Sequence, residues 1–197
     1  KPLDWIKMTM SGRYDMMPGW LWLIPKKIID RVGGWDDRLS LNNDFEFSIR
    51  LLSQSSSVLF CPDAKIYYRS GNSSTLSAIN SEPAYRAAIL SARLGCTQLL
   101  SKDNSASIQL LCANKYSYWL YRVYPYYPSL VKELEDEIKM LGGTNRKIDE
   151  SPLMHQLQNV LGWKAAKRIK MIMYKLGYER HLLSLKKRSF PPSISTR

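Results

Sequence analysis

The chain has 197 residues, of which 45% are hydrophobic, and it carries a formal net charge of +12. This length and apolar content suffice for one hydrophobic core, so they exclude a chain that is disordered throughout. No run approaches the roughly 20 consecutive apolar residues of a membrane-spanning helix, and Cys61, Cys96 and Cys112 are too widely spaced for a zinc site or a disulfide framework, so a reducing cytoplasm is expected.

The first segment contains a predicted strand. The chain begins with Lys1 and shows no charged-then-apolar signal segment, so we expect it to be the C-terminal part of a longer protein. Residues 1–15 support no firm assignment. Between residues 20 and 24, Trp20 and Trp22 alternate with two leucines, which predicts a strand that ends at Pro25. One or two helical turns are expected next.

A glycine pair, a polar loop and the start of a helix follow. Gly33 and Gly34 permit backbone angles that other residues avoid. Asn43, with Glu46 three positions later, predicts a capping box that begins a helix. Asp44 is then expected in the first turn of that helix, ahead of apolar residues that recur at helical spacing and are predicted to pack inward.

Two short apolar runs come after this helix. Residues 58–61 and residues 65–69 have the composition of strands, and Pro62-Asp63 between them predicts a turn. The second run ends in Arg69, and a loop rich in serine, asparagine and glycine follows. The pattern therefore predicts a strand, a turn and a second strand.

The string from residue 33 to residue 52 resembles the acceptor-side signature of the family-2 glycosyltransferases of GT-A fold. In that signature a glycine pair, an aromatic residue, an acidic residue and a leucine precede an acidic pair, which opens a helix that continues to Arg-Leu. Here Asn43-Asp44 stands where the family has Glu-Asp. The resemblance covers roughly residues 15 to 78. It implies an α/β fold, the C-terminal part of a GT-A (Rossmann-like) domain followed by a helical C-terminal region.

The resemblance also implies a reaction. Asp44 corresponds to the catalytic base of an inverting transfer, from a nucleotide-sugar donor to a hydroxyl of a glycan or lipid-linked acceptor. Arg69 is the candidate for the donor phosphates. A divalent metal, Mg²⁺ or Mn²⁺, is expected from the family, but the chain has no D-x-D element, so its ligands are not expected here and the chain alone is expected to be inactive. The candidate acceptor-binding residues are Trp20, Trp22, Trp35, Asp36, Asp37 and Asn43, with organisation of the loop as the alternative role for Asp36 and Asp37.

Each of these assignments has a simpler alternative. Trp20 and Trp22 are equally well explained as core or rim aromatics. Arg69 suits an ordinary strand end, paired with a nearby carboxylate. Asp44 could serve only the helix dipole, because acidic residues stabilise the first turn of a helix.

From residue 82 onward the pattern is helical. Apolar residues at helical spacing predict helices over residues 82–100, 107–124 and 130–141, the last closed by Gly142-Gly143. We expect residues 1–78 to form the acceptor-side half of a catalytic domain, and residues 79–150 to form a helical extension that packs against it. The third helix is predicted to be acidic on its outer side, through Glu133, Glu135, Asp136 and Glu137.

The charge excess lies in the tail. Residues 163–197 hold ten basic residues and one acidic residue, whereas the two charges nearly balance before them. Residues 153–185 predict a basic amphipathic helix with an interruption at Gly177, followed by a disordered end, and residues 151–197 are expected to form one region. Residues 163–188 would suit an anionic membrane surface at the inner face of the membrane. A soluble packing helix is the alternative.

Two functions compete with glycosyl transfer. A non-catalytic module that binds a membrane surface would need only the basic tail. A nucleic-acid-binding module is suggested by charge alone, but the basic residues do not interleave with the aromatic residues and no nucleic-acid motif occurs. Nucleic acid is therefore not the expected partner.

Overall fold

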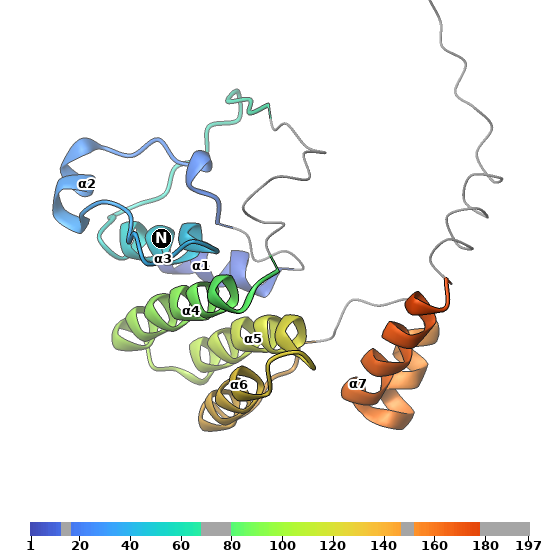
Figure 1. Ribbon diagram of the computed structural model, residues 1–197. Coiled ribbons are helices and arrows are strands. Elements are labelled where there is room, and N and C mark those ends of the chain that lie inside the picture. Colours follow the sequence, from blue (N-terminus) through green and yellow to red (C-terminus); the bar gives the residue numbers. More distant parts are fainter. Residues whose placement is uncertain (13–16, 68–79, 147–151, 178–197) are drawn as a thin grey trace, which may run out of the picture. The chain divides into compact units, whose positions relative to one another are not determined.

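The computed structural model describes residues 1–12, 17–67, 80–146 and 152–177. The chain divides into two compact units, Lys1–Arg146 and Lys147–Arg197. Figure 1 shows the elements of both. The first unit contains α1 (Pro2–Ser11), the 3-10 turn η1 (Gly19–Leu21), α2 (Lys26–Val32), α3 (Asn43–Ser53), α4 (Glu82–Lys102), α5 (Ala106–Val123) and α6 (Pro128–Met140), and the second contains α7 (Pro152–Lys175).

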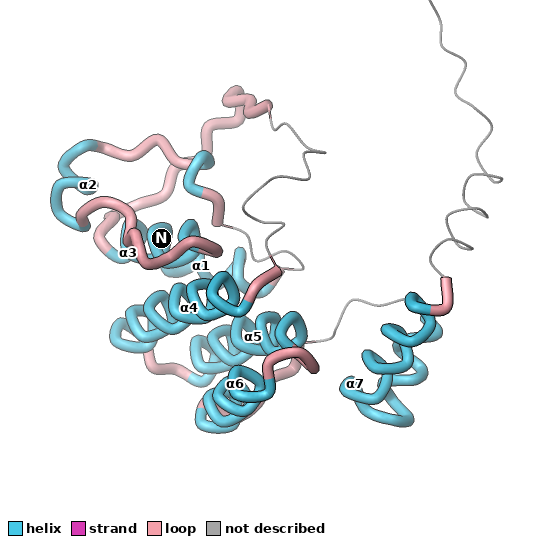
Figure 2. Tube along the Cα trace, viewed as in Figure 1, coloured by secondary structure: helices cyan, strands magenta, loops and turns pink. Residues whose placement is uncertain are grey.

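The prediction of an α/β, Rossmann-like GT-A fold is wrong. Every regular element in the described ranges is a helix, and no strand or sheet occurs there (Figure 2). In place of the first predicted strand lies η1, followed by irregular chain to Pro25, and the described part of residues 58–69 is irregular except for the turn predicted at Pro62-Asp63. A strand needs a neighbouring backbone to pair with, and apolar alternation alone does not supply one. Leu23, Leu59 and Phe60 are instead 100%, 84% and 88% exposed.

The helices of the first unit pack in chain order. α3 packs on α4, α4 on α5, and α5 on α6, while α1 contacts both α3 and α5 (Figure 1). Short connections, residues 103–105 and 124–127, join α4, α5 and α6 and favour packing of each helix on the next, whereas residues 54–81 separate α3 from α4. The core is formed by Phe45, Ile49, Ile89, Leu99, Ile108, Leu130 and Leu134, each at most 2% exposed. Residues on both sides of the predicted boundary at 78 therefore share one core.

A serine and a proline mark the start of α4, and a pair of glycines marks the end of α6. At the start of α4 the Ser81 side chain accepts a hydrogen bond from the Ala84 N–H at 3.4 Å, with Pro83 in the first turn. After α6, Gly142 and Gly143 adopt positive φ angles of 86° and 97°, and the Gly143 N–H reaches the Ile138 carbonyl at 2.9 Å. The predicted stop at this glycine pair is confirmed.

One contact fixes the start of α3 against α4. A Cβ atom placed on Gly95 would lie 2.5 Å from Cε1 of Phe45, so the ring occupies the space that any other residue would fill. Nζ of the buried Lys115 lies 4.2 Å from the centroid of the same ring. Phe45 is thus held between the backbone of α4 and a lysine of α5.

The acidic residues of α6 do not all lie on an outer, solvent-facing side of the helix, as the sequence predicted. Two of the four acidic residues face α4: Arg93 donates to Glu133 at 2.8 Å and to Glu137 at 2.7 Å. Burial raises the pKa of Glu137, and Arg93 opposes that shift. These carboxylates join two helices and do not form a solvated outer face.

α7 is one helix interrupted at Gly162, where φ is 76° and ψ is 158°. Only glycine adopts this conformation readily. The result is two helical arms, 152–161 and 163–175 (Figure 1). The described part of the helix ends at Lys175, and Gly177 has a positive φ of 85°, so the predicted break at Gly177 is present as well. No helix within the described ranges is long and apolar enough to cross a membrane.

Candidate functional site

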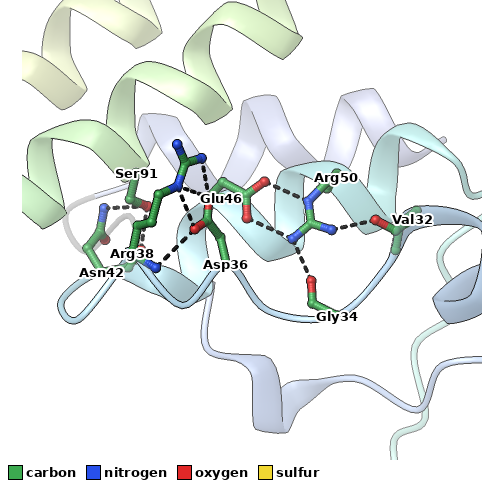
Figure 3. A network of polar contacts seen from close by, with 8 residues as sticks. All are labelled: Val32, Gly34, Asp36, Arg38, Asn42, Glu46, Arg50 and Ser91. Carbon is green, nitrogen blue, oxygen red and sulfur yellow. Dashed lines mark hydrogen bonds and ion pairs between the residues drawn. The ribbon is translucent and has the colours of Figure 1, made fainter.

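The loop between α2 and α3, residues 33–42, is tied to α3 by Arg50. The guanidinium donates to the carbonyls of Val32 and Gly34 at 2.5 and 2.9 Å, and it pairs with the Glu46 carboxylate at 2.6 and 2.9 Å (Figure 3). Glu46 is buried, so its charge needs this partner. The bond to Glu46 raises the pKa of Arg50. A planar guanidinium suits this task because its donors form a fixed fork.

Asp36 organises the middle of the loop. Its carboxylate accepts three side-chain bonds from Arg38, at 2.9, 3.2 and 2.6 Å, and one from the Arg38 backbone N–H at 3.0 Å (Figure 3). These bonds hold the pKa of Asp36 at about 2. A carboxylate with this many donors is already occupied, which favours a structural role for Asp36 over binding of an acceptor hydroxyl.

The far end of the loop is tied to α4. Asn42 adopts the left-handed conformation, with φ at 61°, which asparagine tolerates better than most residues. Its carbonyl accepts from the Ser91 hydroxyl at 2.6 Å, and its side-chain amide donates to the same hydroxyl at 3.4 Å (Figure 3). The amide also donates to the Ala88 carbonyl at 3.4 Å. The loop is thus anchored at its beginning to α3 and at its end to α4.

Asp44 lies in the first turn of α3, as predicted, but the predicted capping box is wrong. The helix begins at Asn43, and Glu46 pairs with Arg50 and does not reach back to the helix start. The Asn43 side-chain oxygen accepts from the backbone N–H of Asp44 at 3.0 Å. This bond orients the first turn, and it leaves the carboxylate of Asp44 half-buried at the helix start.

Asp44 and Trp35 meet at Gly19. A Cβ atom on Gly19 would lie 2.8 Å from Cη2 of Trp35 and 3.3 Å from Oδ1 of Asp44, so the ring and the carboxylate both approach the same bare backbone. The Trp35 ring stacks on Phe47, with centroids 4.0 Å apart, and remains 45% exposed. An ionisable oxygen and an accessible aromatic surface therefore lie together at the rim of the unit.

The other predicted acceptor-binding residues are placed differently. Trp22 donates from Nε1 to the buried Ser48 at 3.2 Å, and its ring packs on Trp5 with centroids 4.7 Å apart. Its contacts are those of a packing residue. Trp20, in η1, is 49% exposed, and Asp37 is exposed on the loop.

The donor side has no counterpart among the described residues. Arg69 lies outside them. The described ranges contain no group of three or more histidine, cysteine, aspartate or glutamate side chains that could hold a metal ion. The residues present there do not fit a divalent cation.

Sequence reasoning missed the residues that hold the loop. Arg50 was recognised only as part of a motif, although Glu46 and Arg50 have the spacing of a helical ion pair. The tie through Ser91 has no local signal, because Asn42 and Ser91 lie 49 positions apart.

No protein-family model, no curated protein and no solved structure matches this chain. The resemblance of residues 15–78 to the family-2 glycosyltransferases therefore stays a prediction.

Proposed function

We propose that this chain supplies the acceptor side of a glycosyl-transfer site, with Asp44 as the general base. The observation that supports the proposal is the convergence of the Asp44 carboxylate and the exposed Trp35 ring on Gly19. An aromatic ring offers a flat surface on which the C–H face of a sugar can pack.

The reaction needs one proton transfer from the acceptor. As the acceptor oxygen attacks the anomeric carbon of the nucleotide sugar, its proton moves to a carboxylate oxygen of Asp44. The new carbon–oxygen bond forms on the face opposite the leaving group. The bond to the nucleoside diphosphate breaks, and its electron pair stays on the phosphate oxygen. The configuration at the anomeric carbon is inverted.

The fixed loop gives this base a defined place. Asn43 bonds the Asp44 backbone, and Phe45, the next residue, is held against Gly95. A base fixed in this way needs little reorganisation when an acceptor binds, and positioning of this kind lowers the barrier to transfer.

The test measures release of nucleoside diphosphate from a panel of nucleotide sugars, with simple saccharides as acceptors, on the complete protein that contains this chain. Asp44→Asn keeps the shape of the side chain and removes the base, so turnover should fall about 100-fold or more. Asp136→Asn, an exposed carboxylate on α6, is the matched control and should retain turnover. Equal turnover in wild type and Asp44→Asn would remove Asp44 from this role.

Steady-state kinetics distinguish the role of Trp35 from that of Asp44. Trp35→Leu should raise the KM for the acceptor with a smaller effect on kcat, because it removes the packing surface and leaves the base in place. A loss of kcat alone would contradict the assignment of Trp35 to the acceptor.

A further inference from the structure

The described part of the second unit is strongly basic. Residues 152–177 contain no aspartate or glutamate. They contain five basic residues, all in the second arm of α7: Lys164, Lys167, Arg168, Lys170 and Lys175. A helix with this charge and no acidic residue attracts polyanions and repels a second copy of itself.

Large apolar side chains are exposed on the same helix. Ile172 is 57% exposed and Leu176, four residues further on, is 81% exposed. Arg168 lies four residues before Ile172, so these three residues occupy one row along the helix. At the other end of the unit, Val160 and Leu161 are 81% and 51% exposed. One basic and two aliphatic side chains therefore follow one another along one accessible row of the second arm.

Another part of α7 is buried. Met154 in the first arm and Ala166 in the second are only 5% and 1% exposed. Both arms thus keep part of their apolar surface buried, while the row from Arg168 to Leu176 stays accessible. The charged row and the packed face are separate surfaces of one helix.

We propose that this surface of α7 binds the face of an anionic lipid bilayer. The basic side chains would lie among the lipid headgroups and the exposed isoleucine and leucine would enter the acyl boundary, as interfacial helices do. Charge complementarity sets the preference for anionic lipid. The predicted segment 163–188 is described only to residue 177, and the proposal rests on residues 152–177 alone.

Lipid fits this surface better than nucleic acid does. Phosphate backbones would engage the same lysines but leave Ile172 and Leu176 exposed. The exposed aliphatic side chains therefore favour anionic lipid over nucleic acid as the partner.

The test is flotation of the full chain with vesicles of phosphatidylcholine, alone or mixed with phosphatidylglycerol. We expect binding to the mixed vesicles only. In Lys164→Gln/Arg168→Gln/Lys175→Gln the partition coefficient should fall about 100-fold, because each basic residue near the surface contributes about fivefold. Ile172→Ser/Leu176→Ser should lower it about tenfold or more. Because Ile172 and Leu176 are exposed, these changes leave the packed face intact.

Matched controls come from the first unit. Lys27→Gln/Arg31→Gln/Lys132→Gln changes the net charge equally at exposed positions and should keep binding within about twofold. Equal losses in both triple variants, equal binding to phosphatidylcholine alone, or a preference for duplex DNA over vesicles would each overturn the proposal. So would a concentration-dependent dimer that loses vesicle binding. None of these outcomes bears on Asp44.

Discussion

Substitution of the glycine in the middle of α4 should have two opposite effects on the free energy of unfolding. Replacing Gly95 by alanine favours the helix by about 1 kcal/mol, since glycine is a poor helix former. The added methyl carbon would, however, lie 2.5 Å from Cε1 of Phe45 and 3.0 Å from Cδ1. The first distance is about 1 Å shorter than a normal carbon–carbon contact.

The clash should outweigh the gain in helix propensity. Phe45 is 2% exposed, and Nζ of Lys115 lies 4.2 Å from its ring centroid, so the ring has little room to move. Overpacking a well-packed core costs about 1–3 kcal/mol, and this contact belongs at the upper end of that range. Gly95→Ala should therefore lower the free energy of unfolding by about 1–2 kcal/mol.

Urea denaturation measures the effect, and a double-mutant cycle isolates its cause. In a Phe45→Leu background the ring is gone, so Gly95→Ala should stabilise the protein by about 1 kcal/mol. The coupling energy between the two positions is then about 2–3 kcal/mol. A stabilised Gly95→Ala single variant, or a coupling near zero, would refute the packing of Phe45 against α4.

Two further predictions concern the loop. Arg50→Lys should lower the free energy of unfolding by about 2 kcal/mol in urea denaturation, because a lysine cannot serve Glu46 and two carbonyls together; Arg31→Lys, at an exposed position, should change nothing. Asp36 has a pKa of about 2 against an ordinary 3.8, so its contribution to stability is present above pH 3.8 and is lost as the pH falls through about 2. The difference in Tm between wild type and Asp36→Asn should shrink over that window, and a constant difference from pH 6 to pH 2 would contradict it.

The helices after residue 80 were predictable because their apolar faces repeat at helical spacing. α4, α5 and α6 begin and end within about two residues of their predicted bounds. The helix α7 does break at the predicted Gly177, where φ is 85°, but the earlier interruption at Gly162 was missed. Gly162 sits inside a long helical pattern, which is a known signal for a break, but its positive φ cannot be read from periodicity.

The prediction of strands failed for a different reason. Alternation around Trp20 and Trp22 describes which side chains suit a sheet face, whereas pairing depends on a neighbouring backbone. The Trp22 indole instead found its partners in Trp5 and Ser48, contacts across 17 and 26 positions. Such long-range partners leave no trace in the local sequence.

The site was predictable in part. Asp44 was expected in the first turn of a helix and lies there. Its approach to Trp35 across Gly19 joins three separate segments and follows from tertiary packing alone. The acidic residues Asp36 and Glu46 were harder to assign, because whether a carboxylate meets an arginine or a ligand depends on side chains that only the fold brings near.

The two anchors of the loop, Arg50 at one end and Ser91 at the other, bear on the thermodynamics of recognition. A segment tied by the protein's own hydrogen bonds has already lost most of its conformational entropy on folding, so a partner that docks beside it forfeits little more. Association with such a preorganised surface is limited by desolvation and fit, and much less by the freezing of backbone motion.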